Sequence, residues 1–291
     1  MANLKEIRTR IRSVKNTQQI TRAMKMIAAA RLRKAQEAIV AKRPYAQRLK
    51  DVIVTLAGRA EQDDHALLQV REPKNVLLLV LTSDRGMCGG FNLNISRATV
   101  RYVNDNKDIH DSISLSIIGK KGQDFFGRRP EYQVSKMYQG VFENVGFDKA
   151  NEIGDDIIGA YVGQGLDAVY MVYNEFKSAM TQNLVVEKLL PVEPNEVNDD
   201  DTAVSLDFEY EPSKAAVLDE VLPLYVNMQI YRAILESIAS EMGARMTAMD
   251  AATRNAADLI SRLTLTYNRA RQAAITTELM EIIGGAEALK G

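Results

Sequence analysis

The sequence holds one cysteine, two histidines and no tryptophan among its 291 residues, and each shortage excludes a kind of site. The single cysteine, Cys88, can form no disulfide within the chain, which fits a reducing compartment. One cysteine with His65 and His110 leaves too few ligands for a typical zinc site. No apolar run approaches the roughly 18 residues needed to cross a bilayer. We therefore expect a soluble, cytoplasmic chain that holds no metal or cofactor.

Acidic residues are scarce at the N-terminus, although the net charge of the whole chain is only −1. Residues 1–50 contain fourteen basic residues and two acidic ones. Such a surface attracts nucleic acid or an acidic protein surface. Aromatic residues that would stack on bases are absent from the first forty-four positions. A mitochondrial transit peptide is a further alternative, but the pattern continues beyond the length of a usual presequence.

Proline is absent from two long stretches, and both read as helices. Leu224–Ile283 is interrupted only by Gly243, and it would form a helix of roughly 90 Å. Met1–Arg43 is the second stretch. A single compact domain cannot bury such rods along their length. The pattern predicts an antiparallel pair of long helices with the rest of the chain inserted between them.

Apolar spacing predicts which faces of these helices pack. In the first helix one stripe should run through Leu4, Ile7, Ile11 and Val14, stop at residues 16–19, and resume in a shifted phase. The resumed stripe is Ile20, Met24, Ile27, Leu32, Ala35 and Ile39. The second helix has one heptad row of Leu235, Met242, Met249, Ala256, Leu263, Ala270 and Thr277. The second row is Ile238, Ala252, Leu259, Ala273 and Met280, interrupted by Arg245 and Thr266. A charge is costly in a closed seam, so Arg245 should reach solvent or an acidic partner.

Between the helices, buried apolar runs alternate with helical segments, which favours a mainly parallel sheet in an α/β layer. Strands are predicted at 75–82, 112–118, 166–176 and 183–190, with helices ending near 104 and over 119–126 and 148–162. Pro223 is acceptable in a first helical turn, so the long C-terminal helix should begin there.

The glycine-rich segment Ser83–Asn92 (SDRGMCGGFN) follows the first strand and could suggest a nucleotide-binding enzyme. Its glycines fit neither the dinucleotide fingerprint nor the P-loop pattern, so a structural turn is favoured. Cys88 should be a small buried thiol, because nothing places a histidine beside it. Asp155 and Asp156 are adjacent and should diverge into solvent on a helix. These residues form no recognisable catalytic group. Two functions therefore remain as alternatives to a purely structural role, a nucleotide-binding α/β enzyme and a basic coiled-coil protein that binds nucleic acid.

Three motifs carry a resemblance to a known family. Ile7–Lys34 reads IRTRIRSVKNTQQITRAMKMIAAARLRK. The C-terminal stretch contains EMGARMTAMDAATRNA and LTLTYNRARQAAITTELMEIIGGAEAL. Together with SDRGMCGGFN, and in this order, they closely resemble the gamma subunits of F-type ATP synthases of the bacterial type, from end to end of the chain.

The resemblance implies an antiparallel coiled coil of the terminal helices with an inserted Rossmann-like α/β domain. It implies residues 1–57 as the N-terminal helix, 73–195 as the α/β foot domain, 196–222 as a loop and short helix near the c ring, and 223–291 as the C-terminal helix. The expected role is a non-catalytic central-stalk rotor that transmits torque between the membrane c ring and the catalytic beta sites. The partners would be the alpha, beta, epsilon and c subunits, at the cytoplasmic face of the cell membrane.

The resemblance also implies contact residues. Met24, Lys25, Arg31 and Arg33 would face the acidic lever of a beta subunit. Arg271, Gln272, Thr276 and Glu278 would meet catch loops of alpha and beta. Tyr210 and Glu211 would lie near the c ring and epsilon.

Overall fold

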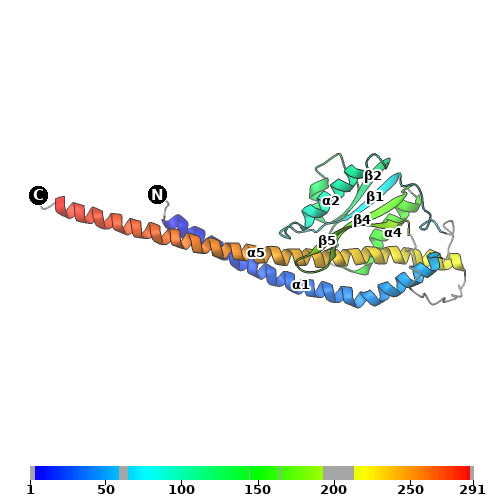
Figure 1. The fold of residues 1–291 in the computed structure, drawn as a ribbon, viewed down its shortest axis with the longest axis horizontal. Coiled ribbons are helices and arrows are strands. Elements are labelled where there is room, and N and C mark those ends of the chain that lie inside the picture. Colours follow the sequence, from blue (N-terminus) through cyan, green and yellow to red (C-terminus); the bar gives the residue numbers. More distant parts are fainter. Residues whose placement is uncertain (1–3, 59–64, 144, 164, 193–212, 289–291) are drawn as a thin grey trace. The chain divides into compact units, whose positions relative to one another are not determined.

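The computed structural model describes residues 4–58, 65–143, 145–163, 165–192 and 213–288. The chain divides into two compact units, one of Met1–Ala28 with Met246–Gly291 and one of Ala29–Arg245. Two long helices, α1 (Leu4–Gly58) and α5 (Lys214–Ala288), contribute residues to both units (Figure 1). The predicted pair of long terminal helices is therefore confirmed.

Helix α5 begins at Lys214, nine residues before Pro223, so the prediction that it starts at this proline was wrong. A proline inside a helix removes a backbone hydrogen bond and costs roughly 3 kcal/mol. Leu218, Leu222 and Val226 lie on both sides of Pro223, and each is at most 1% exposed. Burying one such side chain contributes about 1.5–3 kcal/mol, which together outweighs the cost of the proline.

The second unit is built on a five-stranded sheet with the order β3-β2-β1-β4-β5. Strands β1 to β4 run parallel to their neighbours, and β5 pairs antiparallel with β4. The strands are β1 Asn75–Leu81, β2 Ser112–Ile118, β3 Gln133–Tyr138, β4 Ala168–Phe176 and β5 Gln182–Leu190. The mainly parallel sheet agrees with the prediction.

Strand β3 was not predicted, and its composition explains why. It is an edge strand with the sequence QVSKMY, in which Gln133, Ser135, Lys136 and Met137 are exposed. An edge strand buries little of either face, so it lacks the continuous apolar run that marks the central strands.

Both faces of the sheet are covered. Helices α2 (Phe91–Asn106) and α3 (Lys120–Phe126) pack on one face, and α4 (Phe147–Gly163) and the first part of α5 pack on the other. Figure 1 shows α2 and α4 on opposite sides of the strands. Alternate residues of β1 enter the two cores, with Leu77, Leu79 and Leu81 toward α4 and α5.

The chain leaves β1 through α2 on one face, whereas it enters β4 through α4 on the other face. The carboxyl ends of β1 and β4 therefore meet at a topological switch point, where open α/β sheets usually bind their ligands. The segment Ser83–Asn92 begins just after β1, so it lies at this point.

Candidate functional site

In the first unit, α1 and α5 run antiparallel. The hydroxyl groups of Thr21 and Thr253 are 2.8 Å apart, and the Lys25 ammonium lies 2.5 Å from the Asp250 carboxylate. Residue numbers that rise along one helix therefore fall along the other. This agrees with the antiparallel pairing expected from the two proline-free stretches.

The predicted phase shift of the α1 stripe was wrong. The covered residues continue through the polar positions Gln18 and Thr21 to Ala28, while Ile20 is 59% exposed and Ile27 is 56% exposed. The spacing of threes and fours is unbroken, and the hydrogen bond to Thr253 satisfies the Thr21 hydroxyl inside the seam. Polar residues can therefore occupy seam positions here.

On α5, the first predicted heptad row is correct at Met249 and Ala256, which are buried, and at Leu263 and Ala270, which are half-buried. Thr277 is exposed. The second row was wrong beyond Ala252, because the covered positions lie one residue later. They are Thr253, Ile260, Tyr267 and Ala274, whereas Leu259, Ala273 and Met280 are exposed.

The basic residues around Met24 have different surroundings. Lys25 is paired with Asp250, which also binds Arg254 at 3.1 Å. The hydrogen bond from Lys25 holds the pKa of Asp250 below 3.8. Met24 is half-buried beside this pair, so the seam already covers part of its side chain. Arg31 is exposed, and Arg33 is exposed and bonds Glu37 one helical turn away at 2.9 Å.

The last part of α5 has little cover within the described chain. Ala274 is half-buried, and every residue from Ile275 to Ala286 is exposed. Arg271, Gln272, Thr276 and Glu278 are all exposed. The same stretch exposes a set of large apolar side chains: Ile275, Leu279, Met280, Ile282 and Ile283. Such a patch is typical of a surface that a partner covers.

The glycine-rich turn at the switch point is occupied by α5 itself. Arg245 donates hydrogen bonds to the backbone carbonyls of Arg85 and Gly86, at 3.4 and 3.2 Å, and pairs with Glu241 at 2.7 Å. Both side chains are almost fully buried. The predicted acidic partner of Arg245 is therefore present, and it lies on the next turn of the same helix.

This arrangement does not suit a nucleotide. A phosphate cradle needs backbone N–H groups directed at the anion, whereas two carbonyl oxygens of this turn face a cation. The Glu241 carboxylate beside them would also repel phosphate. Cys88 is 2% exposed, as expected for a buried thiol, and it accepts a hydrogen bond from Asn92 at 3.2 Å. The segment is a structural turn.

We expect the Glu241 carboxyl to make stability depend on pH. Burial raises its pKa above 4.5, although the Arg245 cation opposes this. The folded chain then holds the proton better than the unfolded chain, so this contribution to stability is full below pH 4.5 and is lost as the pH rises through the folded pKa. Glu241→Gln should remove this loss. Thermal unfolding at pH values from 4.5 upward should therefore favour the variant progressively, and a constant difference would contradict the assignment.

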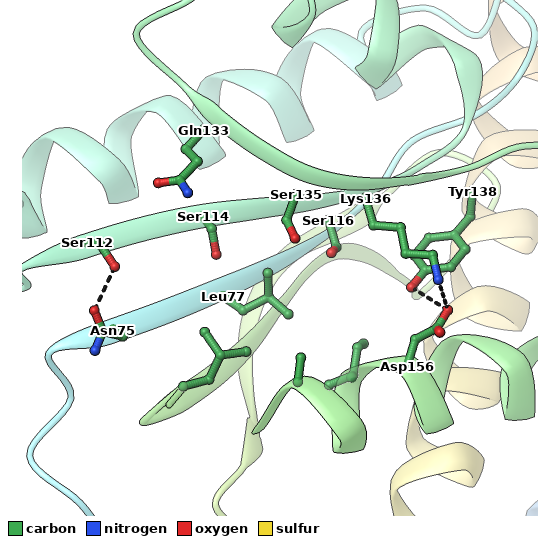
Figure 2. A pocket seen from close by; sticks show the side chains of 13 residues that line it. Asn75, Leu77, Ser112, Ser114, Ser116, Gln133, Ser135, Lys136, Tyr138 and Asp156 are labelled. Carbon is green, nitrogen blue, oxygen red and sulfur yellow. Dashed lines mark hydrogen bonds and ion pairs between the residues drawn. The ribbon is translucent and has the colours of Figure 1, made fainter. Parts of the chain in front are cut away.

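A polar groove of about 490 Å³ lies on the sheet face beside α4 (Figure 2). It is lined by serines of β2 and β3, together with Asn75, Gln133, Lys136, Tyr138 and Asp156. Asp156 accepts hydrogen bonds from Lys136 at 2.5 Å and from the Tyr138 hydroxyl at 3.1 Å. Asp155 is exposed, as predicted, whereas Asp156 is half-buried and bonded at the edge of the groove. The alternating serines of SISLSII were the available sequence signal.

The groove offers hydroxyl and amide groups, and the pair of Lys136 with Asp156 in it is neutral as a whole. Among the residues that the structure describes, no group of three or more His, Cys, Asp or Glu could hold a metal ion. No described helix is long and apolar enough to cross a membrane. Tyr210 and Glu211 lie outside the described residues.

Comparison with known proteins gives one consistent result. The family model described as ATP synthase matches residues 3–289. The ATP synthase gamma chain of Geobacter sp. (strain M21) is 51% identical over 291 residues, and that of Trichlorobacter lovleyi is 49% identical over 292 residues. Each alignment covers 100% of both chains.

Solved structures show the same fold. A chain from the central stalk and c ring of Tetrahymena thermophila mitochondrial ATP synthase has a TM-score of 0.60 at 27% identity, covering 80% of this chain and 99% of its own length. A chain from the OSCP/F1/c-ring structure of Euglena gracilis mitochondrial ATP synthase has a TM-score of 0.72 at 22% identity. That match covers 98% of this chain and 94% of the other.

Proposed function

The chain belongs to the family of ATP synthase gamma chains, and on this premise we propose that it rotates as the shaft between the membrane c ring and the alpha and beta subunits. Membership makes it a subunit of the central stalk, while the catalysis of ATP synthesis lies in other subunits. The proposal extends this role to defined neighbours and a defined movement, with ion flow and ATP synthesis coupled through the shaft.

The observation that carries the proposal is the exposed end of α5. Five large apolar side chains between Ile275 and Ile283 are 48–68% exposed. Burying each of them stabilises an assembly by up to about 1.5–3 kcal/mol, so this end fits an apolar cavity formed by partner subunits. We assign that cavity to a ring of alpha and beta subunits, with Arg271, Gln272, Thr276 and Glu278 contacting their catch loops.

The contacts proposed for α1 are argued from charge. Arg31 and Arg33 are exposed on α1, and Met24 and Lys25 lie on the same helix. We assign these four residues to the acidic lever of a beta subunit, because exposed cations attract a partner of opposite charge. The α/β layer would meet epsilon and the c ring, together with Tyr210 and Glu211. The chain would then be peripheral to the membrane, at its cytoplasmic face.

The purified chain alone is expected to hydrolyse no ATP and to bind none tightly, because the glycine turn presents carbonyl oxygens rather than a phosphate cradle. The chain should co-purify with alpha and beta when the three are produced together, and ATP hydrolysis should appear in that complex. A coupled-enzyme assay measures the hydrolysis. Turnover by the chain alone that is lost on changing Gly89 or Gly90 would favour the nucleotide-binding enzyme instead.

A further inference from the structure

Three polar side chains lie one helical turn apart on the same face of α5, where the helix crosses the hairpin of β4 and β5. They are Arg232, Glu236 and Ser240, and each bonds a group of that hairpin. Residues four apart on a helix point the same way, so the three form one row along the helix. We call them the α5 row.

The first contact of the α5 row is an ion pair with β5. One guanidinium nitrogen of Arg232 lies 2.6 and 2.7 Å from the two carboxylate oxygens of Glu187. The buried Tyr173 hydroxyl, on β4, donates to the same carboxylate at 2.6 Å. Burial raises the pKa of Tyr173, so its hydroxyl keeps the proton that it donates. The carboxylate of Glu187 is thus fixed by two strands and the helix.

The other two contacts reach the backbone of β4. The Glu236 carboxylate accepts from the amide of Phe176 at 2.9 Å, and the buried Ser240 hydroxyl donates to the carbonyl of Asn174 at 2.9 Å. Backbone atoms cannot change rotamer to follow a moving helix. These two bonds therefore favour one rotation of the helix about its own axis.

The rest of this contact is apolar and imposes less direction. Ile230, Ala233, Ile234 and Ala239 are buried in the core beneath the sheet. The burial of apolar area is itself non-directional, so these side chains resist a roll of the helix through close packing rather than through a preferred bond angle. Hydrogen bonds weaken steeply when their angle changes, so the α5 row resists the roll. The backbone also comes close at Gly243, where an added Cβ would lie 3.1 Å from the Cα of Ala179.

We propose that the α5 row is a rotational lock, which prevents α5 from turning against the α/β layer when the shaft carries torque. The inference rests on the proposed function, in which force enters the chain through the α/β layer and leaves it through α5. The three residues are positioning residues for coupling, and none of them touches a reacting group.

The test uses the whole ATP synthase in inverted membrane vesicles, with ATP hydrolysis and ATP-driven ion pumping measured on the same samples. Glu236→Leu removes the acceptor for the Phe176 amide, and its matched control Glu236→Gln keeps a side-chain oxygen there. A second variant, Arg232→Met with Glu187→Gln, removes the ion pair without leaving one charge alone. Its matched control is Lys149→Met with Glu152→Gln, an ion pair within α4.

The lock predicts unchanged ATP hydrolysis in both test variants and a lower ratio of ions pumped to ATP hydrolysed. The ratio should fall below the parent's, and it should fall further as an opposing ion gradient is raised. Both controls should match the parent chain. Ratios equal to the parent's at every gradient would overturn the lock, as would failure of a test variant to assemble, which would make the row merely structural. If the parent chain itself supports no pumping, the proposed function fails instead.

Discussion

Gly119→Ala should destabilise the second unit more than either Gly140→Ala or Gly159→Ala, with a loss of roughly 2–6 kcal/mol in the free energy of unfolding. Gly119 has φ of +93° and ψ of 143°, close to a backbone region that is essentially confined to glycine, and this conformation costs an alanine about 1–3 kcal/mol. Its new Cβ would also lie 2.1 Å from the carbonyl oxygen of Thr82. Overpacking of this kind adds about 1–3 kcal/mol, and here the obstacle is backbone that cannot rotate away.

The position explains why the structure cannot relax around the substitution. The amide of Gly119 donates to the carbonyl of Tyr138 at 3.0 Å, and Thr82 bonds the carbonyl of the preceding residue, Ile118, at 2.9 Å. The ends of β1, β2 and β3 are thus tied together at this residue. Moving Thr82 would also disturb the start of the glycine-rich turn.

The two reference glycines separate the clash from the backbone strain. Gly140 has φ of +70° with no neighbour within 4 Å, so Gly140→Ala should cost only about 1–2 kcal/mol. Gly159 lies in α4 with no neighbour within 4 Å, so Gly159→Ala should stabilise by about 0.5–1 kcal/mol. Urea unfolding followed by circular dichroism measures all three. A Gly119→Ala cost no greater than that of Gly140→Ala would refute the steric argument.

Met24→Lys is expected to leave assembly and ATP hydrolysis intact and to lower ion pumping per ATP hydrolysed by roughly two- to fivefold. The size is that of one partly exposed charge contact, worth up to about 1 kcal/mol. Met24 is half-buried beside the Lys25–Asp250 pair, so the substitution brings a second ammonium group to this part of α1. Under the proposed function the extra cation would also attract the acidic beta lever and alter the contact through which torque is transmitted.

Controls distinguish charge from shape. Met24→Leu has nearly the same volume without a charge, and it should couple like the parent chain. Adding Asp250→Asn to Met24→Lys tests whether the new lysine competes with Lys25 for Asp250. If it does, the ratio of pumping to hydrolysis in the double variant should differ from the ratio in Met24→Lys alone. The ratio of pumping to hydrolysis in membrane vesicles is the measurement. Coupling equal to the parent's in Met24→Lys would refute the assignment of Met24 to the lever contact.

The sequence predicts best those helices and strands whose apolar pattern does not depend on a second element packed against them. Strand β2 was placed at its observed bounds, because an apolar run between polar turns determines a buried strand. The phase of the α1 stripe could not be read from hydrophobicity alone, since Thr21 is buried and Ile20 is exposed. The reason lies on the other helix, where Thr253 provides the hydrogen bond.

In the candidate site, too, some residues could be predicted from the sequence and others could not. Family motifs pointed to Met24 and Arg271, although neither burial nor pairing of these residues follows from spacing. The α5 row was hidden because Arg232, Glu236 and Ser240 resemble an ordinary solvated face, and only the hairpin opposite shows that they are bonded. Long-range pairs of this kind depend on the fold and leave no local period in the sequence.

The Arg245 side chain at the switch point has a consequence for regulation. Open α/β sheets usually bind their ligands at this place, and a ligand that prefers one conformation shifts the protein toward it. Here the arginine of the chain's own helix satisfies the carbonyls of the turn, and a carboxylate stands beside it. We therefore expect no response at this place to the concentration of ATP or ADP. Under the proposed function, the angle of the shaft would then follow from its contacts with partner subunits and not from a nucleotide bound to its own α/β layer.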